Sequence, residues 1–545
     1  MTDVVRNYTW GNARRRRRGF RRHGSGCAKF FVPVLILLAL WCLWLTRDNF
    51  EPHAFIDADS GVEIYITDVI DKRADILRSR VLTLIPESSE GRDIMRTVAE
   101  DPPVPEWLLN NLSAGLCHIS GPGIEDARQL VLSTRMTRIG SIVERLIRFT
   151  PAVNKDYASG LRLRHIPEAG IYYAPRGRTL LLSLSRDSLI HALTLRPDAA
   201  LDAGLYQEGI HMATGADLFC RIDARGIPLD QPPFEKVEIA VRIERDTARL
   251  AVQGRLSPSF MEQYTPFLKG LTPQPLPAPL DGIVSVSMAT AMPLPALIAS
   301  LAEPFPALKT ASAFLKQDEE DKDLLEPVTE IQSLMQQTLS DAGATMRLSW
   351  LGVEPYEMMP APVLAATFDA DTYRVLALFE RIAPAPGVTS GVDLAPRLDD
   401  EYTLAYAPFV GGPAIEPAVA IYGNGMLFST SANVARELLQ TAPLTATHPQ
   451  DGNLYISLKP NEAITAYLDT AREFAVSGLL RNHTETSLED VMQPWVDASA
   501  ALDTVVLFVT CDNGALRAEL KLAMNDTPGP PESEVPETKS QATDE

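Results

Sequence analysis

A cluster of arginines followed by an uncharged apolar run constrains this chain more than any other feature of its sequence. The apolar run, Phe30–Thr46, has 17 residues, near the lower limit for a helix that crosses a bilayer core of about 30 Å. Trp41 and Trp44 lie toward its far end, where indole rings favour the headgroup layer. The basic cluster that precedes the run consists of Arg14, Arg15, Arg16, Arg17, Arg18, Arg21 and Arg22. We therefore expect residues 30–46 to lie in the lipid bilayer as a transmembrane signal anchor.

The arginines also predict the orientation of the chain. Basic residues remain on the cytoplasmic side of a spanning helix, so residues 1–29 should form a basic cytoplasmic segment. A cleaved signal peptide is the alternative, but no small-x-small cleavage site follows Leu45, and Arg47 abuts the apolar run. We expect a single-pass protein of the bacterial inner membrane whose C-terminal bulk is periplasmic.

Net charge divides the chain in the same way. Residues 1–29 carry a net charge of +8, and since the whole chain has −20, the remainder carries −28. This acidic balance argues against nucleic acid as a partner of the exported region. Only Cys117, Cys220 and Cys511 lie outside the N-terminal segments, and none belongs to a C-x-x-C pair. The sequence therefore indicates neither a disulfide framework nor a metal site.

Internal repetition is the second constraint. Tyr172–Ser185 and Ile421–Ser431 both read as a strand, a glycine-containing turn and a second strand, each followed by an apolar-periodic helix. Hairpins with alternating apolar residues recur later in each half, near 237–256 and 505–522. Because these and other blocks keep the same order, we infer that the exported region is duplicated.

The repetition predicts the domain organisation. We expect an α+β fold in which one N-terminal transmembrane helix is followed by two tandem domains, each a mainly antiparallel sheet with helices on one face. The two copies should span residues 51–262 and 280–525, joined by a proline-rich linker over residues 263–279. The acidic tail, residues 526–545, is too polar to bury and should be disordered.

The repeated block resembles one found in a known group of proteins. Phrases like Gly423–Ser431 precede a helix in each domain copy of some bacterial membrane-anchored envelope proteins of unknown function, and the chain is similar to them over most of its exported region. The resemblance implies a duplicated α+β ectodomain and supplies no catalytic residue.

The sequence offers no catalytic motif. It has no G-x-S-x-G nucleophile elbow, no phosphate-binding loop, no G-x-G-x-x-G after a strand and no H-E-x-x-H. Ser185 and Ser431 recur in the repeated block, but neither has a recurring His or Lys that would activate it. Both stand just before a helix, so we expect them to be N-terminal helix caps.

These observations predict a non-enzymatic envelope protein without a cofactor. Its ectodomain would act as a scaffold or binding module for another envelope protein or a polymer. One alternative is an envelope hydrolase that acts on glycan or peptide with dispersed carboxylates, because paired Asp or Glu residues need no local signature. A second alternative is a carrier of lipid or lipoprotein, which would require a large apolar cavity.

The predicted topology is tested by a reporter fused to the carboxyl end. An alkaline phosphatase fusion should be active, because that enzyme folds only outside the reducing cytoplasm. A fusion after Lys29, before the apolar run, is the matched control and should be inactive. A cytosolic carboxyl-terminal reporter, or a mature chain that begins beyond Arg47, would contradict the predicted anchor.

Overall fold

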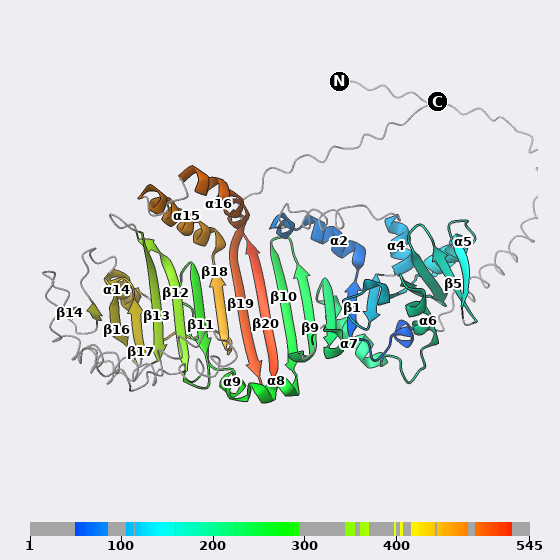
Figure 1. Ribbon diagram of the computed structural model, residues 1–545, viewed down its shortest axis with the longest axis horizontal. Coiled ribbons are helices and arrows are strands. Elements are labelled where there is room, and N and C mark those ends of the chain that lie inside the picture. Colours follow the sequence, from blue (N-terminus) through cyan, green and yellow to red (C-terminus); the bar gives the residue numbers. More distant parts are fainter. Residues whose placement is uncertain are drawn as a thin grey trace, which may run out of the picture.

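The computed structural model describes residues 50–525 with gaps, the longest of which are 85–104, 297–343 and 370–396. These residues form one open sheet of 20 strands, in which every neighbouring pair is antiparallel (Figure 1). The sequence predicted a separate sheet in each copy. Instead, the two sets of strands join edge to edge through β10 and β20.

The strand order follows from the pairings. The N-terminal half runs across the sheet as β4 (Asn154–Ala158), β5 (Leu161–Ile166), β6 (Ile171–Arg176), β7 (Thr179–Ser183), β3 (Val131–Arg135), β2 (Leu116–Gly121), β1 (Val62–Thr67), β8 (Leu218–Asp223), β9 (Phe234–Ile243) and β10 (Thr247–Leu256). The C-terminal half continues as β20 (Ala515–Met524), β19 (Leu502–Asp512), β18 (Leu454–Leu458), β11 (Val284–Ala289), β12 (Thr345–Glu354), β13 (Ala361–Asp369), β17 (Gly425–Ser429), β16 (Ala418–Tyr422), β15 (Leu404–Tyr406) and β14 (Arg397–Leu398).

The two halves have the same order when they are followed outward from the join. Each strand of the N-terminal half occupies the place that the strand numbered ten higher occupies in the C-terminal half. The two hairpins that meet at the join are β9–β10 and β19–β20, and both were predicted from alternating apolar residues. In the second of them Asn513 and Gly514 have φ values of 47° and 81°, as a tight hairpin turn requires.

The two faces of the sheet differ in chemistry. Directly opposite residues of paired strands point to the same face, and Leu250, Leu520 and Leu507 are linked in this way. We call the face that carries these leucines the apolar face. The opposite one, which carries Arg249, Glu519 and other charged residues, is the polar face.

Three helices lie on the polar face. α6 (Arg186–Thr194) packs on Ala174 and Leu181, and α7 (Ala203–Thr214) packs on Tyr65 and Phe219. In the C-terminal half α14 (Ala432–Thr441) covers a core that includes Ala365 and Leu427. These helices therefore hide parts of the polar face near both ends of the sheet.

Other helices lie elsewhere, so the prediction of helices on one face was wrong. α4 (Glu106–Ser113) and α5 (Arg138–Ile147) pack on Tyr173, Leu180 and Leu182, on the apolar face of β6 and β7. Further helices cross the ends of the strands (Figure 1). They are α2 (Val69–Arg78), α8 (Pro258–Gln263), α9 (Thr265–Gly270), α15 (Pro460–Val476) and α16 (Glu485–Ala500). Single 3-10 turns occur at Pro52–Phe55 (η1), Arg80–Leu84 (η2), Ala127–Gln129 (η3) and Ala224–Gly226 (η4).

The expected linker is partly ordered. Residues 265–270 form α9, and the proline-rich stretch after it is held by isolated bridges from Gln274 to Gly452 and from Pro277 to Thr447. No helix among the described residues is long and apolar enough to cross a membrane. The predicted cytoplasmic segment 1–29, the anchor 30–46 and the tail 526–545 lie outside the described residues.

The packing of α7 on the sheet predicts the effect of one substitution. Gly209 lies so close to the Tyr65 ring that an added Cβ would meet Cζ at 2.4 Å. We expect Gly209→Ala to lower the free energy of unfolding by about 1–3 kcal/mol through overpacking, offset by up to about 1 kcal/mol of helix propensity.

A urea midpoint measured on the full chain in polymer nanodiscs checks this prediction. Gly215→Ala, at the end of the same helix, is the matched control, because the nearest atom to its added Cβ is 3.8 Å away. Equal midpoints for the two variants would show that α7 does not press on Tyr65.

Candidate functional site

The apolar face is unbroken across nine consecutive strands, from β8 to β13. The register places one apolar residue opposite another on every pair of these strands. The residues are Leu218, Cys220, Ile222, Val237, Ile239, Val241, Ile243, Ala248, Leu250, Val252, Gly254, Leu516, Ala518, Leu520, Leu522, Val505, Leu507, Val509, Cys511, Leu454, Ile456, Leu458, Val284, Val286, Met288, Met346, Leu348, Trp350, Leu364, Ala366 and Phe368. We refer to them as the apolar strip.

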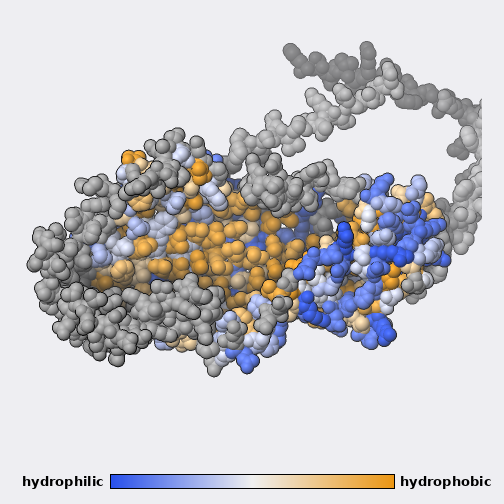
Figure 2. Space-filling view, in the orientation of Figure 1, coloured by the Kyte–Doolittle hydropathy of each residue, from blue (hydrophilic) through white to orange (hydrophobic). Residues whose placement is uncertain are grey.

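Solvent reaches much of the apolar strip. Leu348 and Leu364 are 43% and 37% exposed, and Phe428 on the adjoining strand β17 is 39% exposed. Figure 2 views this face directly and shows hydrophobic side chains gathered over the middle of the sheet. On this face α4 and α5 cover β6 and β7, and no helix of the described chain covers the central strands.

The size of the apolar strip separates it from ordinary surface hydrophobicity. Nine strands about 4.8 Å apart, each with three or four residues on one face, define an area of roughly 1,000 Å². The largest apolar patch of a typical soluble monomer is about 300–600 Å² and is often functional. The apolar strip is therefore a candidate binding surface.

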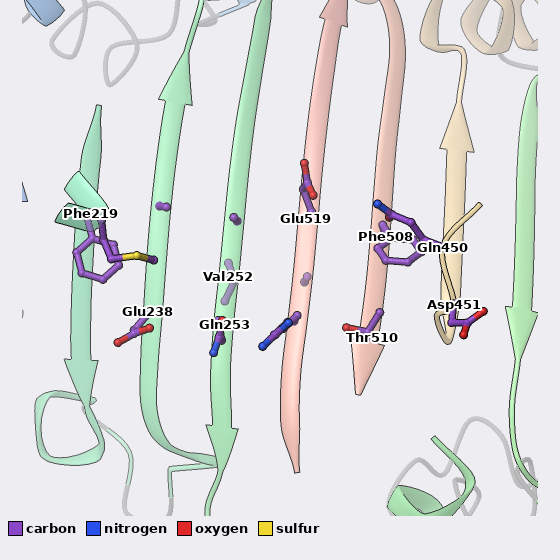
Figure 3. Close-up of a pocket in the computed structure, with 14 residues that line it drawn as sticks. Phe219, Glu238, Val252, Gln253, Gln450, Asp451, Phe508, Thr510 and Glu519 are labelled. Carbon is purple, nitrogen blue, oxygen red and sulfur yellow. The ribbon is translucent and has the colours of Figure 1, made fainter. Parts of the chain in front are cut away.

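A pocket lies on the other face, at the join of the two halves (Figure 3). It has a volume of about 460 Å³ and is lined by residues of β8, β9, β10, β19 and β20 and by the segment before β18. Phe219 and Phe508 supply apolar walls, and Glu238, Arg517 and Glu519 supply charges. Because it lies between the halves and contains carboxylates, it is the pocket in which we test for a catalytic pair of acids.

The carboxylate of Glu238 is already committed to structural partners. It lies 2.7 Å from Lys236 Nζ and 3.1 Å from Arg221 Nε. Burial raises the pKa of Glu238, but the hydrogen bonds and positive charges of Lys236 and Arg221 outweigh burial, so this pKa lies below its usual value. A general acid at neutral pH needs a raised pKa, so Glu238 does not have the property of a hydrolytic acid.

Arg221 is the centre of this charge cluster. Its guanidinium is nearly buried and also lies 3.6 Å from Glu63 and from Glu208. A buried guanidinium needs partners for its charge. The carboxylates of Glu63, Glu208 and Glu238 supply them, and they link Arg221 on β8 to β1, α7 and β9. The cluster therefore has a structural role beside the pocket.

His118, on β2, also points to the polar face of the sheet. It is fully buried, stacks edge-on against Tyr65 with ring centroids 4.5 Å apart, and has Nδ1 3.4 Å from Ser133 Oγ. Its Nε2 and the hydroxyl of Tyr206 are buried without a hydrogen-bond partner. Burial and the charge of Arg221 lower the pKa of His118 to about 3, so the ring is neutral at physiological pH.

Metal and thiol chemistry have little support in this region. The described residues contain no group of three or more His, Cys, Asp or Glu side chains arranged to hold a metal ion. Cys117, Cys220 and Cys511 are free thiols. Burial, with the charge of Glu63, raises the pKa of Cys220 to about 11, which disfavours the reactive thiolate.

The predicted site residues fall in two groups. Ser185 Oγ accepts a hydrogen bond from the backbone N–H of Ser188 at 3.3 Å, and Ser431 Oγ accepts one from Val434 at 3.4 Å, both at the starts of helices. The residues predicted to set the orientation of the chain in the membrane lie outside the described residues. They are Arg14, Arg15, Arg16, Arg17, Arg18, Arg21, Arg22, Trp41 and Trp44.

Sequence reasoning missed the apolar strip as a surface. The alternating residues in β9–β10 and β19–β20 were recognised, but each alternation was interpreted as the buried side of a separate domain. Continuity of the alternation through β18, β11 and β12 is the signal that would have found it.

The burial of His118 predicts a pH dependence of stability. The unfolded chain binds a proton at His118 with a pKa near 6.5, whereas the folded chain does so only near pH 3. Stability is therefore lost as the pH falls below 6.5, by about 2 kcal/mol at pH 5 if His118 acts alone.

We expect His118→Phe to flatten this dependence, because phenylalanine preserves the contact with Tyr65 and has no proton to bind. Urea midpoints at pH 7 and pH 5 for both chains provide the measurement. An unchanged difference between the two pH values in His118→Phe would show that other groups cause the loss.

Comparisons with known proteins give little. No family model and no curated protein matches the chain. Solved structures of TP0453 in crystal forms IV, III and I are similar, with 11%, 10% and 12% sequence identity. They cover 38%, 40% and 38% of this chain and 82%, 86% and 80% of that protein, with TM-scores of 0.23, 0.22 and 0.20. Scores this low assign neither a common fold nor a function.

Proposed function

We propose that the protein is a membrane-anchored binding module of a bacterial envelope, without catalytic activity, that holds its ligand on the apolar strip. The observation that carries this proposal is the apolar face of β8 to β13, which no helix among the described residues covers. At about 25 cal/mol per Å², covering roughly 1,000 Å² is worth on the order of 20 kcal/mol before the costs of association. This free energy favours the binding of a ligand that covers the apolar strip.

The proposal includes the predicted duplication. The matching strand orders on the two sides of the β10–β20 join support descent of both halves from one unit. So does the likeness of the hairpins β6–β7 and β16–β17, each followed by a serine-capped helix. Joining two such units edge to edge doubles the width of the binding surface.

The hydrolase alternative receives no comparable support. The pocket at the join has carboxylates, but Glu238 is neutralised by Lys236 and Arg221 and its pKa is lowered. We therefore propose a binding role for the apolar strip and a structural role for the charges behind it.

Cysteine accessibility in spheroplasts tests the location and the binding surface together. Leu348→Cys places a thiol on the apolar strip, and Lys521→Cys places one on the exposed polar face of β20. A membrane-impermeant maleimide should label Lys521→Cys and leave Leu348→Cys protected by the ligand. The unsubstituted chain gives the background of the natural cysteines, and labelling in urea shows that both thiols are competent.

The two possible failures are distinct. Equal labelling of both variants in spheroplasts would show that nothing occupies the apolar strip. Labelling of neither variant before the cytoplasmic membrane is permeabilised would place the sheet in the cytoplasm and overturn the predicted topology.

A further inference from the structure

We infer that the occupant of the apolar strip is the hydrocarbon chain of membrane lipid. This inference rests on the proposed binding function and names its ligand class. It commits to lipid acyl chains rather than to a protein partner or a second copy of the chain.

The chemistry of the apolar strip carries the inference. Its 31 positions on nine strands include no charged side chain, no amide and no hydroxyl. The strongest side-chain donor, the indole N–H of Trp350, is used internally, 2.7 Å from the carbonyl oxygen of Gly352. Acyl chains neither donate nor accept hydrogen bonds, so their contact with this surface leaves no polar side chain without a partner.

A protein partner would require a surface with more polar groups. Protein interfaces form about one hydrogen bond per 100–200 Å², so roughly 1,000 Å² should offer about five to ten polar contacts. The polar groups of β9, β10 and β20 instead point to the opposite face, where Arg249, Gln253 and Lys521 are exposed. The separation of polar and apolar residues between the two faces therefore favours hydrocarbon over polypeptide.

The predicted membrane anchor attaches the sheet to the bilayer through a short spacer. Only five residues, 47–51, separate the predicted bilayer segment from η1, the first described element. Five extended residues span at most about 18 Å. If residues 30–46 lie in the bilayer, η1 lies within that distance of the membrane surface and keeps the sheet attached beside lipid, the most abundant apolar material there.

The dimensions also fit an acyl chain. Three or four residues on one face of a strand extend about 20–25 Å, at two residues per 6.8 Å. One leaflet of a bilayer contributes about 15 Å of hydrocarbon thickness, so an acyl chain with the reach it has in a leaflet fits along the strands of the strip. Several chains would lie side by side along nine strands.

Site-specific photocrosslinking of the full chain in bacterial cells tests the inference. The photoreactive residue p-benzoylphenylalanine replaces Leu348 on the apolar strip or, as the matched control, Lys521 on the polar face. Cells are fed an alkyne-tagged fatty acid, irradiated, and the purified chain is examined for the tag and for its mass. We expect an acyl adduct at position 348 at least tenfold above that at position 521.

Each other outcome overturns the inference in a distinguishable way. A dimer adduct, or an adduct to a different protein, would overturn the lipid ligand and leave the proposed binding module standing. An adduct within the same chain would overturn both, as would no adduct above the level at position 521.

A second measurement does not depend on the crosslinker. The purified full chain in polymer nanodiscs is titrated with a fatty acid whose fluorescence rises in apolar surroundings. Leu250→Lys places a charge on the apolar strip, and Ala251→Lys places the same charge on the polar face one residue later. We expect a loss of affinity of at least tenfold for Leu250→Lys and no change for Ala251→Lys. The urea midpoints of both variants must match that of the parent chain, which shows that both are folded. Equal fatty-acid affinities of the two folded variants would overturn the inference.

Discussion

The main-chain ladder between β10 and β20 is the interaction on which the rest of the architecture depends. It pairs nine residues of each strand, from Thr247 with Ala523 to Arg255 with Ala515. Because direct neighbours in a ladder share a face, this register aligns the apolar side of one half with the apolar side of the other. A shift by a single residue would place Leu250 and Val252 beside Lys521 and Glu519 and would divide the apolar strip into two smaller patches. The width of the surface is thus a consequence of one register.

The two faces of the sheet have different roles. The polar face carries the groups that fix the strands relative to each other, such as the buried Arg221 with its carboxylates and the neutral His118 against Tyr65. The apolar face contributes few such bonds in its centre and remains available. Soluble α+β proteins usually cover the apolar side of an antiparallel sheet with helices and leave the polar side to water. Here α6, α7 and α14 lie on the polar side instead, so the described helices leave the middle of the apolar side open.

Local features of this fold could be predicted from the sequence, and long-range ones could not. The hairpins β9–β10 and β19–β20 were predictable because alternation with a period of two is a property of neighbouring residues. The caps at Ser185 and Ser431 depend on the next three residues alone. The β10–β20 ladder joins the last strand of the N-terminal half to the last strand of the C-terminal half, and no local pattern records which edges will meet. The same limit explains the error about α4 and α5, because periodicity shows that a helix has an apolar side but not which face of a sheet receives it.

The position of β20 in the chain has a consequence for biosynthesis. It is the last strand of the described chain, yet its partner β10 ends at Leu256, before the C-terminal half has been synthesised. Until the final hairpin emerges, β10 is an edge with unpaired N–H and C=O groups beside a row of aliphatic side chains, the kind of edge that recruits foreign strands. Contacts of such high sequence separation also form slowly. The nascent chain therefore exposes this unpaired edge during much of its synthesis, so protection by a chaperone would matter more for this protein than for one whose edge strands pair early.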